Sequence, residues 1–316
     1  MTPLLFTSIP PCVRGEALER TTASSPQLVT IRSWIGAGFQ PVSINLRQEI
    51  QRFPDLPATL EHFGVETLVV EPRWPVVPEA PLCPFLDFLD AIARRSQGDC
   101  LAILNADIRL APSPDRSLAG RVSGLGDDEY LVAQRSDLSS WDDGRRRRMI
   151  HAYGFDFVAF RSPWIGRISR SLTPDLGFGL PWWDHYLPLA LAALGAQTRL
   201  VDPRWFEHDV HAFQWNWDHY CRIGRTAARQ FQETLEAREA LPDSLPARAW
   251  LDAIEMESVH PAVPGSFRQP LRQLAMTAGV PNLLAKSVLG RVAAANVRII
   301  LQSATSGPLP VPQGLG

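Results

Sequence analysis

The chain has few cysteines and none of the short fingerprints of the commonest nucleotide-binding or hydrolytic enzymes. Its four cysteines are scattered, and no two form a Cys-x-x-Cys pair, which argues against a zinc pattern or a disulfide framework. No Gly-x-Gly-x-x-Gly, Gly-x-x-x-x-Gly-Lys-Ser/Thr, Gly-x-Ser-x-Gly or His-Glu-x-x-His segment is present. These absences disfavour the common dinucleotide and NTP sites, and nucleophilic catalysis by Ser or Cys.

The chain also lacks a strong charge of one sign and a long hydrophobic run. Its formal net charge is -2 over 316 residues, so there is no electrostatic case for nucleic acid or an anionic membrane as partner. No apolar stretch is long enough to cross a bilayer, and the short N-terminal apolar run lacks the basic residues of a signal peptide. We expect a globular, cytoplasmic protein without a transmembrane segment.

The first third of the sequence alternates between apolar runs and amphipathic segments. Residues 4–9 predict a buried strand, residues 40–45 and 66–70 predict two further strands, and residues 26–34 and 84–97 predict helices. Alternation of this kind is typical of a parallel sheet with right-handed crossovers, which places the chain in the α/β class.

Beyond Pro112 the pattern changes. Residues 130–134 and 155–160 predict strands, and the polar segment between them, with the run Arg145–Arg148, predicts a solvated loop. A helix is predicted over 187–194 and a short strand over 199–201.

The apolar run from Leu101 to Ile108 ends in Asn105-Ala106-Asp107. In open α/β sheets, ligands bind at the carboxyl ends of the strands, and this strand would deliver one amide and one acid there. That pair suits a hydroxyl-rich ligand and a hard metal ion. An Asp that only caps the following turn is the alternative.

A second candidate is Asp184, which lies among three aromatic residues just before a predicted helix. It either caps the free N–H groups of that helix or acts as a general base beside a sugar ring stacked on the aromatics. Ten tryptophans in the chain, concentrated at 182–217, favour a binding cleft there.

Two further groups could contact an anionic ligand. His208 and His211 lie beside acids after a strand end, and imidazole with carboxylate suits Mn²⁺ or a similar divalent ion. Arg135 directly follows a predicted strand and Arg14 follows the first Pro-Pro turn, so either guanidinium could bind a diphosphate.

Taken in order, these segments resemble a known family, the GT-A-type nucleotide-diphospho-sugar transferases. The resemblance covers roughly residues 2–220 and implies a Rossmann-like, mixed and mainly parallel sheet flanked by helices. It rests on these segments: Phe6-Thr7-Ser8-Ile9-Pro10-Pro11, Trp34…Gly38-Phe39…Val42-Ser43-Ile44-Asn45…Glu49-Ile50, Leu104-Asn105-Ala106-Asp107-Ile108, Gly154-Phe155-Asp156-Phe157, Trp183-Asp184, and His208 with His211.

The resemblance also implies roles for single residues. Asp107 matches the acid that holds a divalent cation, Mn²⁺ or Mg²⁺, on the donor diphosphate. Asn105 stands in place of the first acid of that Asp-x-Asp motif, where an amide still binds hydroxyls but removes one negative charge. Asp184 matches the general base, and His211, or else His208, completes the metal site.

The remaining expected contacts belong to the nucleotide. Thr7, Ser8 and Asn45 lie at the ends of the early strands and would hold the nucleoside. Arg14 and Arg135 would bind the diphosphate, whose charge grows as it leaves.

The function expected from this resemblance is transfer of a sugar from a nucleoside diphosphate to an acceptor hydroxyl, on a glycan or another molecule. Residues 1–220 would form the catalytic domain, 221–305 a helical extension that could form a homodimer contact, and 306–316 a disordered tail. A nucleotidyltransferase and a non-catalytic sugar-binding or scaffold protein on the same fold are the alternatives.

Overall fold

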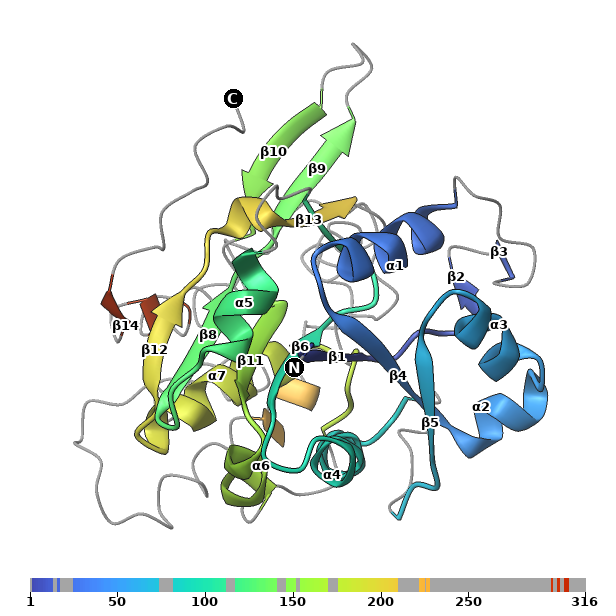
Figure 1. The fold of residues 1–316 in the computed structure, drawn as a ribbon, viewed down its shortest axis with the longest axis horizontal. Helices are drawn as coiled ribbons and strands as arrows, with labels where there is room; N and C mark the ends of the chain where they lie inside the picture. The colour runs from blue at the N-terminus through green and yellow to red at the C-terminus, as the bar shows by residue number, and fades with distance from the viewer. Residues whose placement is uncertain are drawn as a thin grey trace, which may run out of the picture.

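A computed structural model of the chain places the predicted strands in one sheet (Figure 1). The structure describes residues 2–13, 16–17, 25–73, 82–111, 117–140, 146–151, 154–169 and 176–209, with residues 222–224, 226–227, 297, 300–301 and 304–306 near the C-terminus. Within these residues, no helix is both long and apolar enough to span a membrane.

Eight strands of the described part form the main sheet, in the order β14-β12-β8-β11-β6-β1-β4-β5. Only β11 runs antiparallel to its neighbours, and the other pairs are parallel. The strands are β1 (Leu4–Thr7), β4 (Gln40–Leu46), β5 (Glu66–Val70), β6 (Cys100–Leu104), β8 (Glu129–Ala133), β11 (Phe157–Arg161), β12 (Gln197–Leu200) and β14 (Ala304–Ser306). The mixed, mainly parallel α/β sheet expected from the sequence is confirmed.

Helices cover both faces of this sheet. The apolar side chains of α4 (Phe85–Arg95), α6 (Pro163–Ile168) and α7 (Trp183–Ala193) pack on one face. Those of α1 (Pro26–Gly36), α3 (Leu56–His62) and α5 (Ser117–Ser123) pack on the other. A short helix, α2 (Arg47–Arg52), follows β4 and has no buried residue. All five residues of β6 are buried, as expected for a strand covered on both sides.

A smaller sheet lies next to the carboxyl ends of the main strands. Its order is β10-β9-β13-β7. The strands are β7 (Ile108–Leu110), β9 (Ser136–Ser140), β10 (Arg146–Ile150) and β13 (Phe206–Asp209), the last preceded by the short 3-10 helix η3 (Pro203–Trp205). The hairpin of β9 and β10 extends away from the body of the molecule (Figure 1). A further small ladder pairs β2 (Cys12–Val13) with β3 (Glu16–Ala17).

The structure differs from the expected elements at several places. The run Leu101–Ile108 is not one strand, because β6 ends at Leu104 and β7 begins at Ile108, with Asn105-Ala106-Asp107 in the turn between them. Arg146–Ile150 is a strand rather than a loop, because it pairs with β9. Helix α7 begins at Trp183, so Asp184 lies in its first turn.

The C-terminal part of the chain contributes to the main sheet, which was not expected from its sequence. β14 pairs in parallel with β12 and lies at the boundary between the expected extension and the tail. Most of 221–305 lies outside the described residues, so the helical extension and its dimer contact stay predictions.

Candidate functional site

Side chains from both sheets form one polar network at the carboxyl edge of the main sheet. We call it the edge network, and its members are Asn105, Asp107, Arg135, Asp137, Asp156 and His208. Four of the six were expected site residues from the sequence, and the structure places these four in one cluster.

The topology explains how residues far apart in sequence meet there. Asn105 follows β6 and Arg135 follows β8, and both strands end at this edge. Asp156 precedes β11, and because β11 is antiparallel, its beginning lies at the same edge. The reversed strand thus adds a carboxylate between the ends of two parallel ones.

Asp156 is tied to both of its neighbours through one oxygen. Asn105 donates from Nδ2 to Asp156 Oδ1 over 2.7 Å, and Arg135 Nη1 lies 3.1 Å from the same oxygen. Arg135 also donates from Nε to Asp137 Oδ1 over 2.8 Å. With two carboxylates beside it, Arg135 has a raised pKa even though burial opposes its charge. It is a permanent cation at this edge.

His208 lies between two carboxylates. Its Nδ1 is 2.9 Å from Asp137 Oδ1, and its Nε2 is 3.3 Å from Asp107 Oδ2. β13 carries His208 and pairs with β9, which carries Asp137, so the small sheet sets this contact. Burial and the charge of Arg135 oppose protonation of His208, but its bonds to the two carboxylates outweigh them and raise its pKa.

Asp137 is the centre of this part of the network. His151 Nδ1 lies 3.2 Å from its second oxygen, Oδ2. Burial opposes ionisation of Asp137, but the bonds to His151 and His208 and the charge of Arg135 hold its pKa below the usual range. It is therefore ionised at neutral pH.

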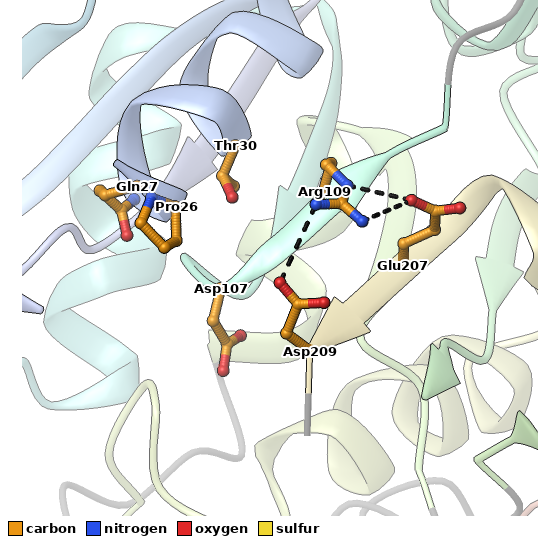
Figure 2. A pocket seen from close by; sticks show the side chains of 7 residues that line it. All are labelled: Pro26, Gln27, Thr30, Asp107, Arg109, Glu207 and Asp209. Atoms are coloured by element: carbon orange, nitrogen blue, oxygen red, sulfur yellow. Dashed lines mark hydrogen bonds and ion pairs between the residues drawn. The ribbon is translucent and has the colours of Figure 1, made fainter. Parts of the chain in front are cut away.

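A polar pocket adjoins the network on the side of Asp107 (Figure 2). Its lining comes from the first turns of α1, from the turn and strand after β6, and from β13: Pro26, Gln27, Thr30, Asp107, Arg109, Glu207 and Asp209. Arg109 binds Glu207 in an ion pair of 2.8 Å and lies 3.9 Å from Asp209. Gln27 donates to the carbonyl of Ala106 and so braces the turn that carries Asp107.

Asp184 lies near the network but on α7. The backbone N–H of Trp182 donates to Asp184 Oδ1 over 3.0 Å, and Trp182 holds a left-handed φ of 84° that an aromatic residue rarely adopts. A Cβ on residue 154 would collide with Asp184 Oδ2, so Gly154 makes room for this carboxyl. Burial, and then the negative charge of Asp156, raise the pKa of Asp184 to about 8, although Arg135 opposes the shift.

The expected nucleoside contacts lie at the ends of β1 and β4. Thr7 is fully buried, and its hydroxyl has no hydrogen-bond partner among the described residues. Ser8 is partly exposed. Asn45 donates from Nδ2 to the carbonyl of Ile9 over 2.9 Å and to Glu49 over 2.7 Å. One amide hydrogen of Asn45 therefore holds the loop after β1 and the other binds α2, while its buried Oδ1 accepts from Ser43 Oγ over 2.7 Å.

We expect the Asn45→Asp variant to lower the free energy of unfolding by about 2–4 kcal/mol at pH 7, because it loses two donors and places a carboxylate beside Glu49. Urea unfolding monitored by fluorescence measures the loss. The deficit should shrink at pH 4.5, since burial raises the pKa of Glu49 and that group takes up a proton first. A loss below about 0.5 kcal/mol would contradict a structural role for Asn45.

Two expected site residues are not placed. Arg14 and His211 lie outside the described residues, so their roles stay predictions. Conversely, Asp137 and Asp156 were not expected as site residues. Asp156 belongs to the segment Gly154-Phe155-Asp156-Phe157 that carries the resemblance, but no role was assigned to it there, and Asp137 lies inside a strand where no motif marks it.

No protein-family model matches this chain, and no curated protein matches it. Among solved structures, it is similar to a mannosyltransferase of Pyrobaculum calidifontis in complex with GDP-Man and Mn²⁺. The match has a TM-score of 0.39 and 12% sequence identity, and it covers 96% of this chain and 85% of the other.

Proposed function

We propose that the protein is a glycosyltransferase that moves a sugar from a nucleoside diphosphate to an acceptor hydroxyl. The observation that carries the proposal is the arrangement Asp107–His208–Asp137 at the carboxyl edge of the sheet. There, one imidazole has a carboxylate at each ring nitrogen.

The geometry of His208 suits a divalent cation. A carboxylate on one ring nitrogen fixes the tautomer and leaves the other nitrogen as a metal ligand, and Asp137 holds Nδ1 in this way. That other nitrogen, Nε2, and Asp107 Oδ2 lie 3.3 Å apart, a separation that two ligands of one ion can adopt. Among the described residues, no three or more His, Cys, Asp or Glu side chains are placed so that together they could hold a metal ion. Mg²⁺ and Mn²⁺ accept such sparse protein ligation when phosphate oxygens and water complete their shell.

Asp107 and His208 would hold the cation, and the cation would supply positive charge for the departing diphosphate. Arg135 lies beside them and adds a fixed positive charge that needs no metal. Asn105 keeps the Asp156–Arg135 pair in place through its amide.

Asp184 is the general base of this proposal. Its carboxyl is held by the N–H of Trp182, and its pKa of about 8 places it close to neutral pH, where a base can both accept and release a proton. In the ionised form it would remove the proton from the attacking acceptor hydroxyl.

Calorimetric titration with UDP and GDP, each with and without Mn²⁺, tests the proposal. We expect one of the two nucleotides to bind, with an affinity at least about tenfold higher in the presence of Mn²⁺. UDP-glucose and GDP-mannose then show whether a sugar donor binds and whether nucleoside diphosphate is released from it.

The other outcomes identify the alternatives. No binding of any nucleotide would favour a non-catalytic scaffold, and a preference for a nucleoside triphosphate would favour a nucleotidyltransferase. If Mn²⁺ changes no affinity, Asp107 and His208 form only an ion pair.

A further inference from the structure

We infer that Asp156 is a sugar-binding residue, whose free carboxylate oxygen accepts a hydrogen bond from a hydroxyl of the donor sugar. This rests on the proposed function and names a contact that decides which sugar is accepted. Asp156 is not in the Asn-x-Asp motif or on the helix of the general base.

The two oxygens of Asp156 have very different surroundings. Oδ1 accepts from Asn105 and Arg135, whereas Oδ2 is buried and has no hydrogen-bond partner among the described residues. The residue is only 2% exposed. A buried carboxylate oxygen without a donor is costly, so this position favours any ligand that brings an O–H to it.

The position of Asp156 matches where the sugar must lie. Its Oδ1 is bonded to Arg135, which lies on the side of the expected diphosphate. On the other side is Asp184, whose carboxyl abuts Gly154 and is affected by the charge of Asp156. In a displacement at the anomeric carbon, the sugar ring lies between the leaving diphosphate and the base. Asp156 lies between the residues proposed for these two roles.

The chemistry of the contact predicts selectivity. A site that offers only an acceptor selects a ligand with a donor at that point, and it rejects an analogue without one, because the buried oxygen is then left unsatisfied. A sugar hydroxyl is such a donor. The nucleoside diphosphate alone does not reach this contact, so Asp156 should affect the binding of the sugar and not that of the nucleotide.

The Asp156→Asn variant distinguishes the roles of the two carboxylate oxygens. Its amide oxygen can still accept from Asn105 and Arg135, while an NH₂ group, which cannot accept, replaces Oδ2. We expect the affinity for GDP or UDP, whichever binds the wild-type protein, to change less than about threefold. The affinity for the matching sugar nucleotide, GDP-mannose or UDP-glucose, should fall about tenfold or more, by calorimetry.

Glu129→Gln is the matched control. Glu129 also pairs with an arginine, Arg199, but at the opposite edge of the same sheet. This variant should bind both the nucleotide and the sugar nucleotide as the wild-type protein does.

Deoxy sugars provide a test whose first part uses only the wild-type protein. We expect one monodeoxy analogue to bind the wild-type protein about tenfold more weakly than the complete sugar nucleotide does. The Asp156→Asn substitution should lower the affinity for that analogue only slightly further. The assignment would be overturned if Asp156→Asn lowered the affinities for nucleotide and sugar nucleotide equally. It would also be overturned if every deoxy analogue bound the wild-type protein with full affinity. Failure of the wild-type protein to bind any nucleotide would instead overturn the proposed function, and the assignment with it.

Discussion

The Asp184→Asn variant is expected to lose about 10²–10⁴-fold in turnover while its affinity for the nucleotide stays within about twofold of wild type. The amide keeps the shape of the side chain and an oxygen that can accept from Trp182, but it cannot take a proton from the acceptor. Release of nucleoside diphosphate from the sugar donor, with a panel of sugars as acceptors, measures turnover. Calorimetry measures the affinity.

The pH profile tests the same carboxyl. A base must be ionised, and burial and Asp156 raise the pKa of Asp184 to about 8, so the fraction of active enzyme grows with pH below that value. The wild-type kcat/KM should rise about tenfold per pH unit from pH 5.5 to 7.5 and level off above about pH 8.5. The residual rate of Asp184→Asn should lack this rise.

Asp99→Asn is the control, because Asp99 is also partly buried and lies just before β6, at the opposite edge of the sheet. Its rate and pH profile should match those of the wild-type protein. An Asp184→Asn enzyme with full turnover would exclude Asp184 as the base.

The Asp107→Ala variant is expected to lose at least about 10²-fold in kcat/KM and to bind the nucleoside diphosphate equally with and without Mn²⁺. It removes one of the two described ligands proposed for the cation, and Asp107 is the more exposed of the pair. Asp137→Asn should give an intermediate result, a loss of about 10–100-fold in Mn²⁺ affinity, because Asp137 orients His208 and is not itself one of the proposed ligands.

Glu66→Gln completes this series. Glu66 is an acid of similar exposure, paired with Arg95 at the amino end of β5. It should respond to Mn²⁺ as the wild-type protein does. If Asp107→Ala retains its response to Mn²⁺, the cation binds elsewhere in the chain.

Much of the main sheet could be predicted because the local sequence of its strands is typical of strands. β6 is a compact apolar run, β4 and β5 are short segments with β-branched residues, and the helix between β5 and β6 repeats its apolar residues at helical spacing. The hairpin β9–β10 could not be predicted in the same way. Arg146–Ile150 is polar at its start, and its strand conformation depends on pairing with β9 rather than on a local pattern.

In the candidate site, too, residues that follow a recognisable strand could be predicted, whereas contacts made by strand pairing could not. Asn105 and Asp107 could be found because they follow an apolar run, and Arg135 because it follows a strand. The contact of His208 with Asp107 depends on the pairing of β13 with β7 in the small sheet. These strands lie far apart in the sequence, so no local pattern predicts that they pair. Asp156 was missed as a site residue because the reversal of β11 could not be foreseen. In a parallel strand, its position would lie at the opposite edge.

The pairing of β14 with β12 has a consequence for the order of assembly. Thr198 pairs with Ala304, so the strand that flanks β12 is synthesised long after the rest of the sheet. Before then, no other described strand covers this edge of β12, and other chains could extend it by strand addition. β14 covers this edge only after residues 304–306 have left the ribosome, and until then the sheet carries an open strand edge of the kind that makes partly folded chains prone to aggregation.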